Sequence, residues 1–351
     1  MERIQKITPP DAAAMDAARA HWNSIAKPLG SFGLLEDMVT KIAGIQCTPD
    51  PDISRRTAVI LCADHGVTAQ GVSQCGSDVT AVCAAAIAEG RSNVNSLAKA
   101  YGAEVIAADM GMVQEIDCPK LLKRRIAAGT ADFSAQPAMT RAQAEQAIRY
   151  GIDLAFRAKE QGAQILLTGE MGIGNTTAAS AIAAVLLGKD PAEVTGRGAG
   201  LSDAGLQRKI AVIRKALALH EPDASDPIGV LAAVGGFEVA GMTGLFLGGA
   251  VCRMPVVIDG VISAAAAALA CRIEPMTADY LLPSHSSDEP AGEGLLRLMG
   301  LQAPIHAGLR LGEGTGGMLL LPLLDGTLAL YRTAHTFAQE EIPQYEALSG
   351  L

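Results

Sequence analysis

Residues 165–177 read Ile-Leu-Leu-Thr-Gly-Glu-Met-Gly-Ile-Gly-Asn-Thr-Thr. The three apolar residues at the start have strand character, and the two threonines at the end open an Ala-rich run of helical character. Between them lies a predicted turn that contains Gly169, Gly172 and Gly174. A strand, a glycine-rich loop and a helix start, in this order, direct backbone N–H groups and the positive end of a helix toward an anion. The stretch therefore predicts an α/β unit with an anion-binding loop.

The spacing from Gly169 to Thr176 approaches that of the P-loop, but Asn175 stands where the P-loop has its lysine. Without that lysine the loop lacks the charge that reaches the β- and γ-phosphates of a nucleotide. The loop therefore predicts a site for a smaller anion, such as a monophosphate, rather than for ATP. A tight turn without a ligand is the alternative, and three glycines close to Glu170 and Asn175 favour the ligand loop.

The composition is that of an α/β protein with a large core. The chain has 351 residues, which is long enough for one large domain with a smaller accessory part. Hydrophobic residues make up 49%, aromatic residues only 3%, and there are 38 glycines, which suits helices packed closely on a parallel sheet. The net charge of −9 argues against a nucleic-acid partner, although a local positive site for a phosphate stays compatible with it.

The cysteines and the apolar segments predict a cytoplasmic protein without a membrane partner. Seven cysteines are scattered without a C-x-x-C pair, which argues against a disulfide framework or a zinc site. Residues 1–7 contain no apolar h-region, so we expect no signal peptide. The most apolar tract, residues 228–251, is interrupted by Glu238 and seven glycines, which predicts a buried pair of elements rather than a membrane span.

Polar residues follow the predicted strands. The strand at 57–63 ends in Asp64-His65, the strand at 104–108 ends in Asp109, and the strand at 255–258 ends in Asp259. Ligands of α/β proteins bind outside the carboxyl ends of the strands. His65 has no metal-ligand partner at helical or hairpin spacing, so we interpret it as a structural histidine bonded to a backbone carbonyl rather than as a base or a ligand.

Two further glycine-rich segments follow. Residues 196–200 precede a helix that carries Lys209, which could provide the positive charge that Asn175 does not. The alternative is an ordinary solvated lysine, and the glycine context favours ligand binding. Residues 309–317 contain Glu313, and the loop described first contains Glu170.

Glu170 and Glu313 are candidates for a general base, because desolvation between glycines raises a carboxyl pKa toward neutrality. A glutamate placed favourably at a helix N-terminus is an equally good interpretation of Glu313. The chain has no nucleophile elbow, no H-E-x-x-H and no Asp-rich metal motif. Because these motifs are missing, we expect a transfer reaction that needs no metal.

Recurring strand–loop–helix units predict a doubly wound α/β fold with a mainly parallel sheet flanked by helices. We expect residues 51–324 to form a Rossmann-like domain that carries the active site, and residues 1–50 and 325–351 to form a small helical domain. Expected helix starts are Asp11 as an N-cap, Ser77 as an N-cap, and Thr140 with Gln143 as a capping box.

These motifs together resemble the nicotinate-nucleotide–dimethylbenzimidazole phosphoribosyltransferase family of cobalamin biosynthesis. The similarity runs in order from near residue 25 to near residue 330, and the blocks around Glu170 and Glu313 are highly specific. The motifs that carry it are Lys27-Pro-Leu-Gly-Ser31, Ala63-Asp-His-Gly-Val67, Thr168-Gly-Glu-Met-Gly-Ile-Gly-Asn-Thr-Thr177, Gly196-Arg-Gly-Ala-Gly-Leu-Ser-Asp203, Gly235-Gly-Phe-Glu238 and Arg310-Leu-Gly-Glu-Gly-Thr-Gly316.

The resemblance implies transfer of phosphoribose from nicotinate mononucleotide to a ring nitrogen of 5,6-dimethylbenzimidazole. The products are α-ribazole 5′-phosphate and nicotinate. The glycosidic bond inverts from β to α, which implies a single displacement without a covalent intermediate, a metal or another cofactor. The cationic pyridinium leaving group needs no general acid, whereas the nucleophile must lose a ring N–H proton to a base.

The resemblance also implies roles for individual residues. Glu313 is the expected base, Glu170 is a second carboxylate near the reacting centre, and a homodimer is the expected assembly. The substrate-binding residues that it implies are Gly172, Gly174, Asn175, Thr176, Gly198, Lys209, Ser287, Arg310 and Gly312 on the phosphate side, together with Ser77, Asp64 and His65.

The chain departs from the family pattern at Cys75, Gly76 and Ser77, where many relatives have an aromatic residue, proline and often glutamine. That loop lines the base-binding side in the family, so another benzimidazole, adenine or a phenol stays open as the acceptor. Relatives that use phenols act as heteromers. A mononucleotide-binding protein without chemistry is a competing hypothesis, and a small-molecule kinase or ATPase is disfavoured by Asn175 and the missing metal carboxylates.

Overall fold

The computed structural model describes residues 7–346, and its centre is a six-stranded sheet in the order β3-β2-β1-β4-β5-β6. Every neighbouring pair of strands is parallel. This order is that of a doubly wound sheet, so the predicted α/β fold is confirmed. The strands are β1 (Arg56–Ala63), β2 (Ala103–Gly111), β3 (Leu122–Lys123), β4 (Ile165–Met171), β5 (Val256–Ile258) and β6 (Leu281–Pro283).

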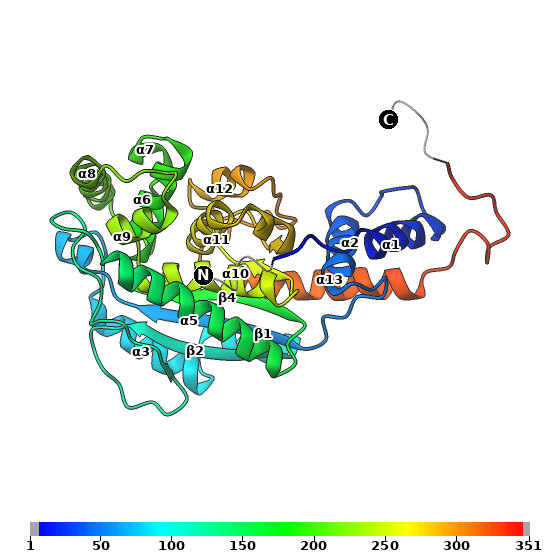
Figure 1. Ribbon diagram of the computed structural model, residues 1–351, viewed down its shortest axis with the longest axis horizontal. Coiled ribbons are helices and arrows are strands. Elements are labelled where there is room, and N and C mark those ends of the chain that lie inside the picture. Colours follow the sequence, from blue (N-terminus) through cyan, green and yellow to red (C-terminus); the bar gives the residue numbers. More distant parts are fainter. Residues whose placement is uncertain (1–6, 347–351) are drawn as a thin grey trace.

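Helices cover both faces of the sheet (Figure 1). Successive residues of β1 point to opposite faces, so Val59 and Leu61 pack with α5, α6, α10 and α11, while Ile60 and Cys62 pack with α2, α3, α4 and α13. The helices are α1 (Ala12–Ser24), α2 (Leu34–Gln46), α3 (Ser77–Glu89), α4 (Asn93–Tyr101), α5 (Arg141–Glu160), α6 (Asn175–Leu187), α7 (Pro191–Val194), α8 (Asp203–His220), α9 (Pro227–Val234), α10 (Phe237–Val251), α11 (Val261–Ile273), α12 (Gly292–Leu298) and α13 (Thr315–Thr333), with 3₁₀ turns at Gly66–Gln70 and Pro275–Tyr280.

The apolar, glycine-interrupted tract forms α9 and α10, so the predicted pair of buried elements is confirmed. Glycines allow α10 to touch the backbone of α5. A Cβ atom at Gly244 would lie 2.0 Å from the Ile148 carbonyl oxygen, and one at Gly151 would lie 1.9 Å from that of Gly241. Across residues 7–346, no helix has both the length and the apolar character that crossing a membrane requires.

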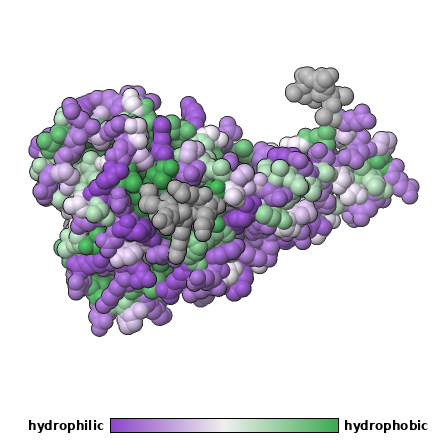
Figure 2. Space-filling view, in the orientation of Figure 1, coloured by the Kyte–Doolittle hydropathy of each residue, from purple (hydrophilic) through white to green (hydrophobic). Residues whose placement is uncertain are grey.

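The first two helices and the C-terminal half of α13 form an arm that projects from the sheet-containing body (Figures 1 and 2). Trp22 of α1 packs edge-on against Tyr331 of α13 with ring centroids 4.8 Å apart, and the His21 ring nitrogen lies 2.6 Å from the Tyr331 carbonyl oxygen. The expected domain boundary at residue 325 falls within α13, which is one continuous helix, and residues 1–6 and 347–351 of the expected helical domain lie outside the described residues. The division into two domains stays a prediction.

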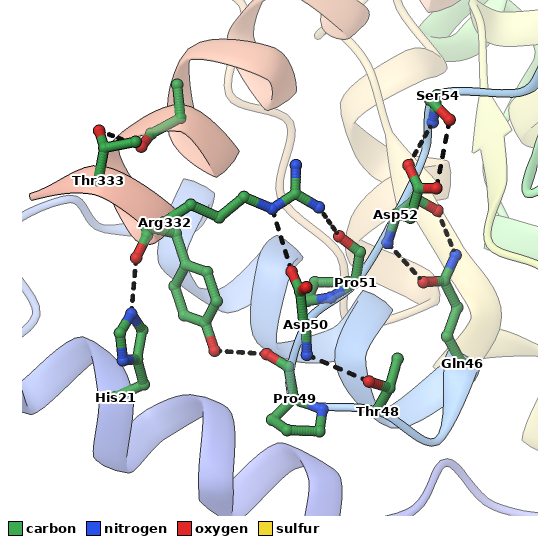
Figure 3. Close-up of polar contacts among 12 residues, drawn as sticks. His21, Gln46, Thr48, Pro49, Asp50, Pro51, Asp52, Ser54, Arg332 and Thr333 are labelled. Atoms are coloured by element: carbon green, nitrogen blue, oxygen red, sulfur yellow. Dashed lines mark hydrogen bonds and ion pairs between the residues drawn. The ribbon is translucent and has the colours of Figure 1, made fainter.

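The segment that leads from the arm into β1 is bonded to the end of α13 (Figure 3). The Arg332 guanidinium donates to the Asp50 carboxylate at 3.0 Å and to the Pro51 carbonyl. The Tyr331 hydroxyl donates to the Pro49 carbonyl at 2.6 Å. These bonds tie the entry of the sheet to the helix that spans both the arm and the body.

Local signals were confirmed at two helix starts and wrong at two other positions. Asp11 caps α1, and Thr140 forms the expected capping box with Gln143. Gly169, expected in the turn, lies within β4. Glycine stands there because a Cβ atom would lie 2.4 Å from Ile60 Cδ1 in the neighbouring strand. Ser77 is the first helical residue of α3 and Gly76 is its N-cap, so the expected serine cap is wrong.

Candidate active site

A cavity of about 250 Å³ opens at the carboxyl ends of β4, β5 and β6. It lies beside the point where strand order reverses between β1 and β4, the position at which doubly wound sheets bind ligands. Its lining comes from three glycine-rich segments that the sequence singled out, and from the segments that follow β5 and β6, of which only Ser287 was predicted to bind substrate. These residues are Glu170–Ile173, Asn175 and Thr176; Gly198 and Ala199; Arg310–Glu313; and Asp259–Ser263 with His285, Ser287 and Glu289.

The first glycine loop is shaped by close contact with β1. A Cβ atom at Gly172 would lie 2.3 Å from the Ala63 carbonyl oxygen, and Gly174 has a φ of +100°, a conformation that favours glycine. The backbone N–H of Ile173 donates to the Thr80 hydroxyl at 3.1 Å. The contacts with Ala63 and Thr80 therefore fix the position of the loop, and the N-terminus of α6 borders the cavity through Asn175 and Thr176.

Glu170 is the penultimate residue of β4, and only 7% of its surface is exposed. The side-chain amide of Asn175 donates to its carboxylate, and the backbone N–H of Glu313 lies 3.5 Å from its other oxygen. Burial raises the pKa of Glu170 to about 8, with nearby Asp259 and Glu238 adding to the rise and the two hydrogen bonds opposing it. The Glu170 carboxyl of the free protein is therefore largely protonated at pH 7.

Glu313 is held in an uncommon backbone conformation. Its φ is +59°, between Gly312 at +83° and Gly314 at +82°, and a non-glycine residue rarely adopts this region. The carboxylate of Asp259 accepts the N–H of Gly314 at 3.1 Å and that of Gly317 at 2.9 Å, and so caps α13 from outside the helix. Such strain persists where surrounding bonds hold it, and it is frequent at functional sites.

The carboxyl group of Glu313 faces the start of α4. Burial raises its pKa, while the side chain of Asn93 and the backbone N–H of Val94 favour the ionised form. Its Oε2 atom is buried without a hydrogen-bond partner among the described residues. The group is thus half-buried with one unused acceptor, which is suited to taking a proton from a ligand.

Asp259 and His285 line the cavity and were not among the residues predicted to bind substrate. Burial raises the pKa of Asp259 and lowers that of His285, and each side chain opposes the shift of the other. His285 packs against Gly316, where a Cβ atom would lie 2.1 Å from its Nδ1. The sequence marks Asp259 only as an aspartate that follows a predicted strand. Asp64 and Asp109 share this pattern, so the pattern alone does not single out Asp259.

Lys209 is fully buried behind the cavity wall. Its ammonium donates to the Thr176 hydroxyl at 2.9 Å and to the Gly196 carbonyl at 3.2 Å. Burial lowers its pKa to about 8, and Glu289 acts against that shift. The alternative of a solvated lysine is wrong, and a Cβ atom at Gly198 would lie only 3.5 Å from the ammonium nitrogen.

Ser287, Arg310 and Gly312 line the cavity as expected. The Arg310 side chain is 61% exposed and pairs with Asp288 at 2.8 Å. An exposed ion pair of this kind is weak, so the guanidinium can exchange Asp288 for an anionic ligand.

The structure does not bring Asp64, His65, Ser77 or Gly174 to this cavity. Asp64 accepts the N–H of Val113 at 2.8 Å. The His65 ring bonds the buried carboxylate of Glu238 at 2.6 Å, so the expected backbone-carbonyl partner is wrong. His65 packs against Gly174: a Cβ atom at Gly174 would lie 3.0 Å from the Cβ atom of His65. This position supports the glycine loop rather than a ligand.

Comparison with known proteins gives a consistent family. A phosphoribosyltransferase family model matches residues 7–342. The nicotinate-nucleotide–dimethylbenzimidazole phosphoribosyltransferase of Roseiflexus sp. (strain RS-1) is 45% identical over 339 residues, 96% of each chain, and that of Ruminiclostridium cellulolyticum is 42% identical over 347 residues, 99% of each chain. The crystal structure of CobT from Thermus thermophilus matches with a TM-score of 0.90 at 37% identity, over 95% of this chain and 100% of that one. The chain therefore belongs to the nicotinate-nucleotide–dimethylbenzimidazole phosphoribosyltransferase family.

Proposed function

We propose that this enzyme transfers phosphoribose from nicotinate mononucleotide to 5,6-dimethylbenzimidazole, in the nucleotide-loop branch of cobalamin biosynthesis. The products are α-ribazole 5′-phosphate and nicotinate. The observation that carries the proposal is Glu313, a half-buried carboxylate with a raised pKa on a strained backbone, in the lining of a cavity whose other walls suit a phosphate. The family of the chain supports the choice of substrates.

The reaction is a single displacement at C1′ of the ribose. The lone pair of one acceptor ring nitrogen forms the new C1′–N bond while Glu313 takes the N–H proton of the acceptor ring. The bond from C1′ to nicotinate breaks, and its electron pair stays on the nicotinate nitrogen, which becomes neutral. Attack from the face opposite the leaving group inverts β to α.

Buried carboxyl groups next to the reacting carbon suit the positive charge of this donor. A cationic pyridinium ring and a developing oxocarbenium ion both favour ionised neighbours, so binding of the donor lowers the pKa of Glu170. Asp259, whose carboxylate is already fixed by two N–H groups, adds to the same field. This charge stabilisation replaces a general acid.

The phosphate group is assigned to the glycine-rich segments of the cavity lining. Gly172, Gly198 and Gly312 bring the backbone to the cavity there, Ser287 supplies a hydroxyl group, and Arg310 supplies an exchangeable charge. Lys209 acts from behind Thr176 and Gly198, and the third hydrogen of its ammonium is not used in its two bonds.

The test is incubation of the purified protein with nicotinate mononucleotide and dimethylbenzimidazole, followed by chromatography. We expect nicotinate and a ribotide of the acceptor to appear together. Folded protein that binds the mononucleotide but releases no nicotinate with any acceptor would instead support a binding protein without chemistry.

The acceptor, the assembly and the location are parts of the proposal that need separate tests. Residues 75–77 depart from the family pattern on the base-binding side, so benzimidazole, adenine and phenol acceptors are compared in competition. We infer a homodimer, which light scattering of the purified chain tests, since a partner-dependent heteromer would stay monomeric alone. We infer a cytoplasmic location from the scattered cysteines, and fractionation of the source cells tests it.

A further inference from the structure

Glu289 places a carboxylate in the wall assigned to the substrate phosphate. It lies in the segment between β6 and α12, lines the cavity and is 9% exposed. Its Oε1 atom accepts the backbone N–H of Gly198 at 3.0 Å. A Cβ atom at Gly196 would lie 2.0 Å from its Oε2, so the carboxylate fills the space beside that loop.

A buried cation stands behind the same wall, because the Lys209 ammonium nitrogen is 3.5 Å from where a Cβ atom of Gly198 would lie. Lys209 spends two of its three donors on Thr176 and Gly196, and Glu289 is the carboxylate whose charge acts on it. A backbone N–H and an ammonium group around one small space form an anion site. We call the Gly198 N–H and the Lys209 ammonium the anion cradle.

We propose that Glu289 is a built-in anion that occupies the anion cradle of the free protein and is displaced by the phosphate group of the incoming mononucleotide. The inference rests on the proposed function, because it assumes that the phosphate binds at this wall. Two anions that share one N–H group and one cation repel each other strongly in a partly buried site, so both cannot stay there. The Glu289 side chain moves out when the phosphate enters.

Displacement lowers the affinity for every phosphate by the same factor. When the cradle is open in about a tenth of the molecules, the apparent dissociation constant rises about 10-fold. A ligand that makes only phosphate contacts then binds too weakly to occupy the site, whereas a mononucleotide also has the contacts of its ribose and its ring. Glu289 thereby limits occupation of the site by inorganic phosphate.

Glu289→Gln tests the proposal, because the amide oxygen still accepts the Gly198 N–H while the competing charge is gone. Calorimetric titrations with inorganic phosphate and with nicotinate mononucleotide should give dissociation constants about 10-fold lower than those of the unmodified protein. Glu293→Gln is the matched control, since it removes the same charge from an exposed pair with Arg297 and should change neither constant more than about 2-fold. Unchanged or weaker binding in Glu289→Gln would overturn the proposal.

A second measurement needs no variant. In a crystal structure of the unmodified protein with nicotinate mononucleotide, the phosphate should accept the Gly198 N–H and the Glu289 carboxylate should have left it. A retained bond from Gly198 to Glu289 in that complex would overturn the proposal even if the variant fails to fold. Normal nicotinate release without these effects rejects only the displaced carboxylate, whereas tighter phosphate binding without nicotinate release rejects only the proposed function.

Discussion

Glu170 and Glu313 are two carboxylates of one cavity, and burial raises the pKa of each in different surroundings. Glu170 is enclosed beside two further carboxylates, and its pKa of about 8 keeps the proton in the free protein. Glu313 is half-buried, and Asn93 and Val94 oppose the effect of burial. Carboxyl groups of one site whose surroundings differ in this way are suited to separate roles. We therefore assign the proton transfer to Glu313 and charge stabilisation to Glu170.

The raised pKa of Glu170 predicts a pH-dependent stability. The unfolded carboxyl ionises near pH 4.5 while the folded one holds its proton to about pH 8, so the folded state binds more protons in this window. The free energy of unfolding should fall as the pH rises from 5 to 8, by no more than about 5 kcal/mol from this group. Urea unfolding of Glu170→Gln at both pH values should show a smaller fall than the unmodified protein. An equal fall in both proteins would refute the pKa assignment.

Lys209 should act on donor binding more than on the chemical step. Lys209→Met keeps the volume and removes the charge, so we expect the KM for nicotinate mononucleotide to rise roughly 10- to 100-fold, the range for a lost charge-assisted hydrogen bond. The kcat should change less. Steady-state kinetics with saturating acceptor measures both, and an unchanged KM would remove Lys209 from the phosphate site.

The sequence predicted which loops form the site, but it did not predict which side chains contact one another there. Asn175 was interpreted as standing in place of a lysine, and the structure shows that its amide donates to Glu170, a contact across the loop between β4 and α6 that spacing does not specify. Asp64, Asp109 and Asp259 all follow predicted strands, although Asp109 lies within β2 in the structure, and among them only Asp259 lines the cavity. The reason is strand order: β5 lies beside β4 on the side away from β1, and no local signal encodes that order.

At the scale of elements, glycine marks contacts between backbones. Gly244→Ala would drive a methyl group into the Ile148 carbonyl and separate α10 from α5, so we expect at least about 2 kcal/mol of destabilisation. Gly326→Ala is the control within α13, where the methyl group meets open space and should stabilise the protein by about 0.5–1 kcal/mol. Thermal unfolding measures both, and similar effects of the two substitutions would contradict this account of the packing.

Strands and helices with strong local patterns were predictable from the sequence, whereas their ends depended on neighbours. The capping box at Thr140 is local and was confirmed. Gly169 looked like part of a turn because glycines are common in turns, but it lies in β4 where Ile60 and the Glu313 backbone leave no room for a side chain. Tertiary contact decided that position, and the sequence alone does not show it.

The whole molecule joins an α/β body to a helical arm through α13. This helix begins two residues after Glu313, and near its other end Tyr331 packs against Trp22 and Arg332 bonds Asp50. Its cap by Asp259 and its contacts in the arm therefore belong to one element. The expected packing of both terminal segments was predicted from where the sheet units start and stop. The continuity of α13 could not be predicted, because Pro322 lies inside it.

Trp22 is the single tryptophan and reports on the arm. Since α13 and the bonded linker at residues 49–51 connect the arm to the body, we expect one cooperative unfolding transition. Tryptophan fluorescence and far-UV circular dichroism should give the same midpoint in urea. An earlier fluorescence transition would show that the arm unfolds by itself and would favour the division into two domains.

The central claim is that this cavity transfers phosphoribose with Glu313 as the base, and one comparison tests it most directly. Turnover of nicotinate mononucleotide with dimethylbenzimidazole is measured for the unmodified protein and for Glu313→Gln, with bound mononucleotide verified in both. We predict release of nicotinate by the unmodified protein and turnover at least ~100-fold slower in the variant, the usual scale for loss of a general base. Near-normal turnover of Glu313→Gln would contradict the account.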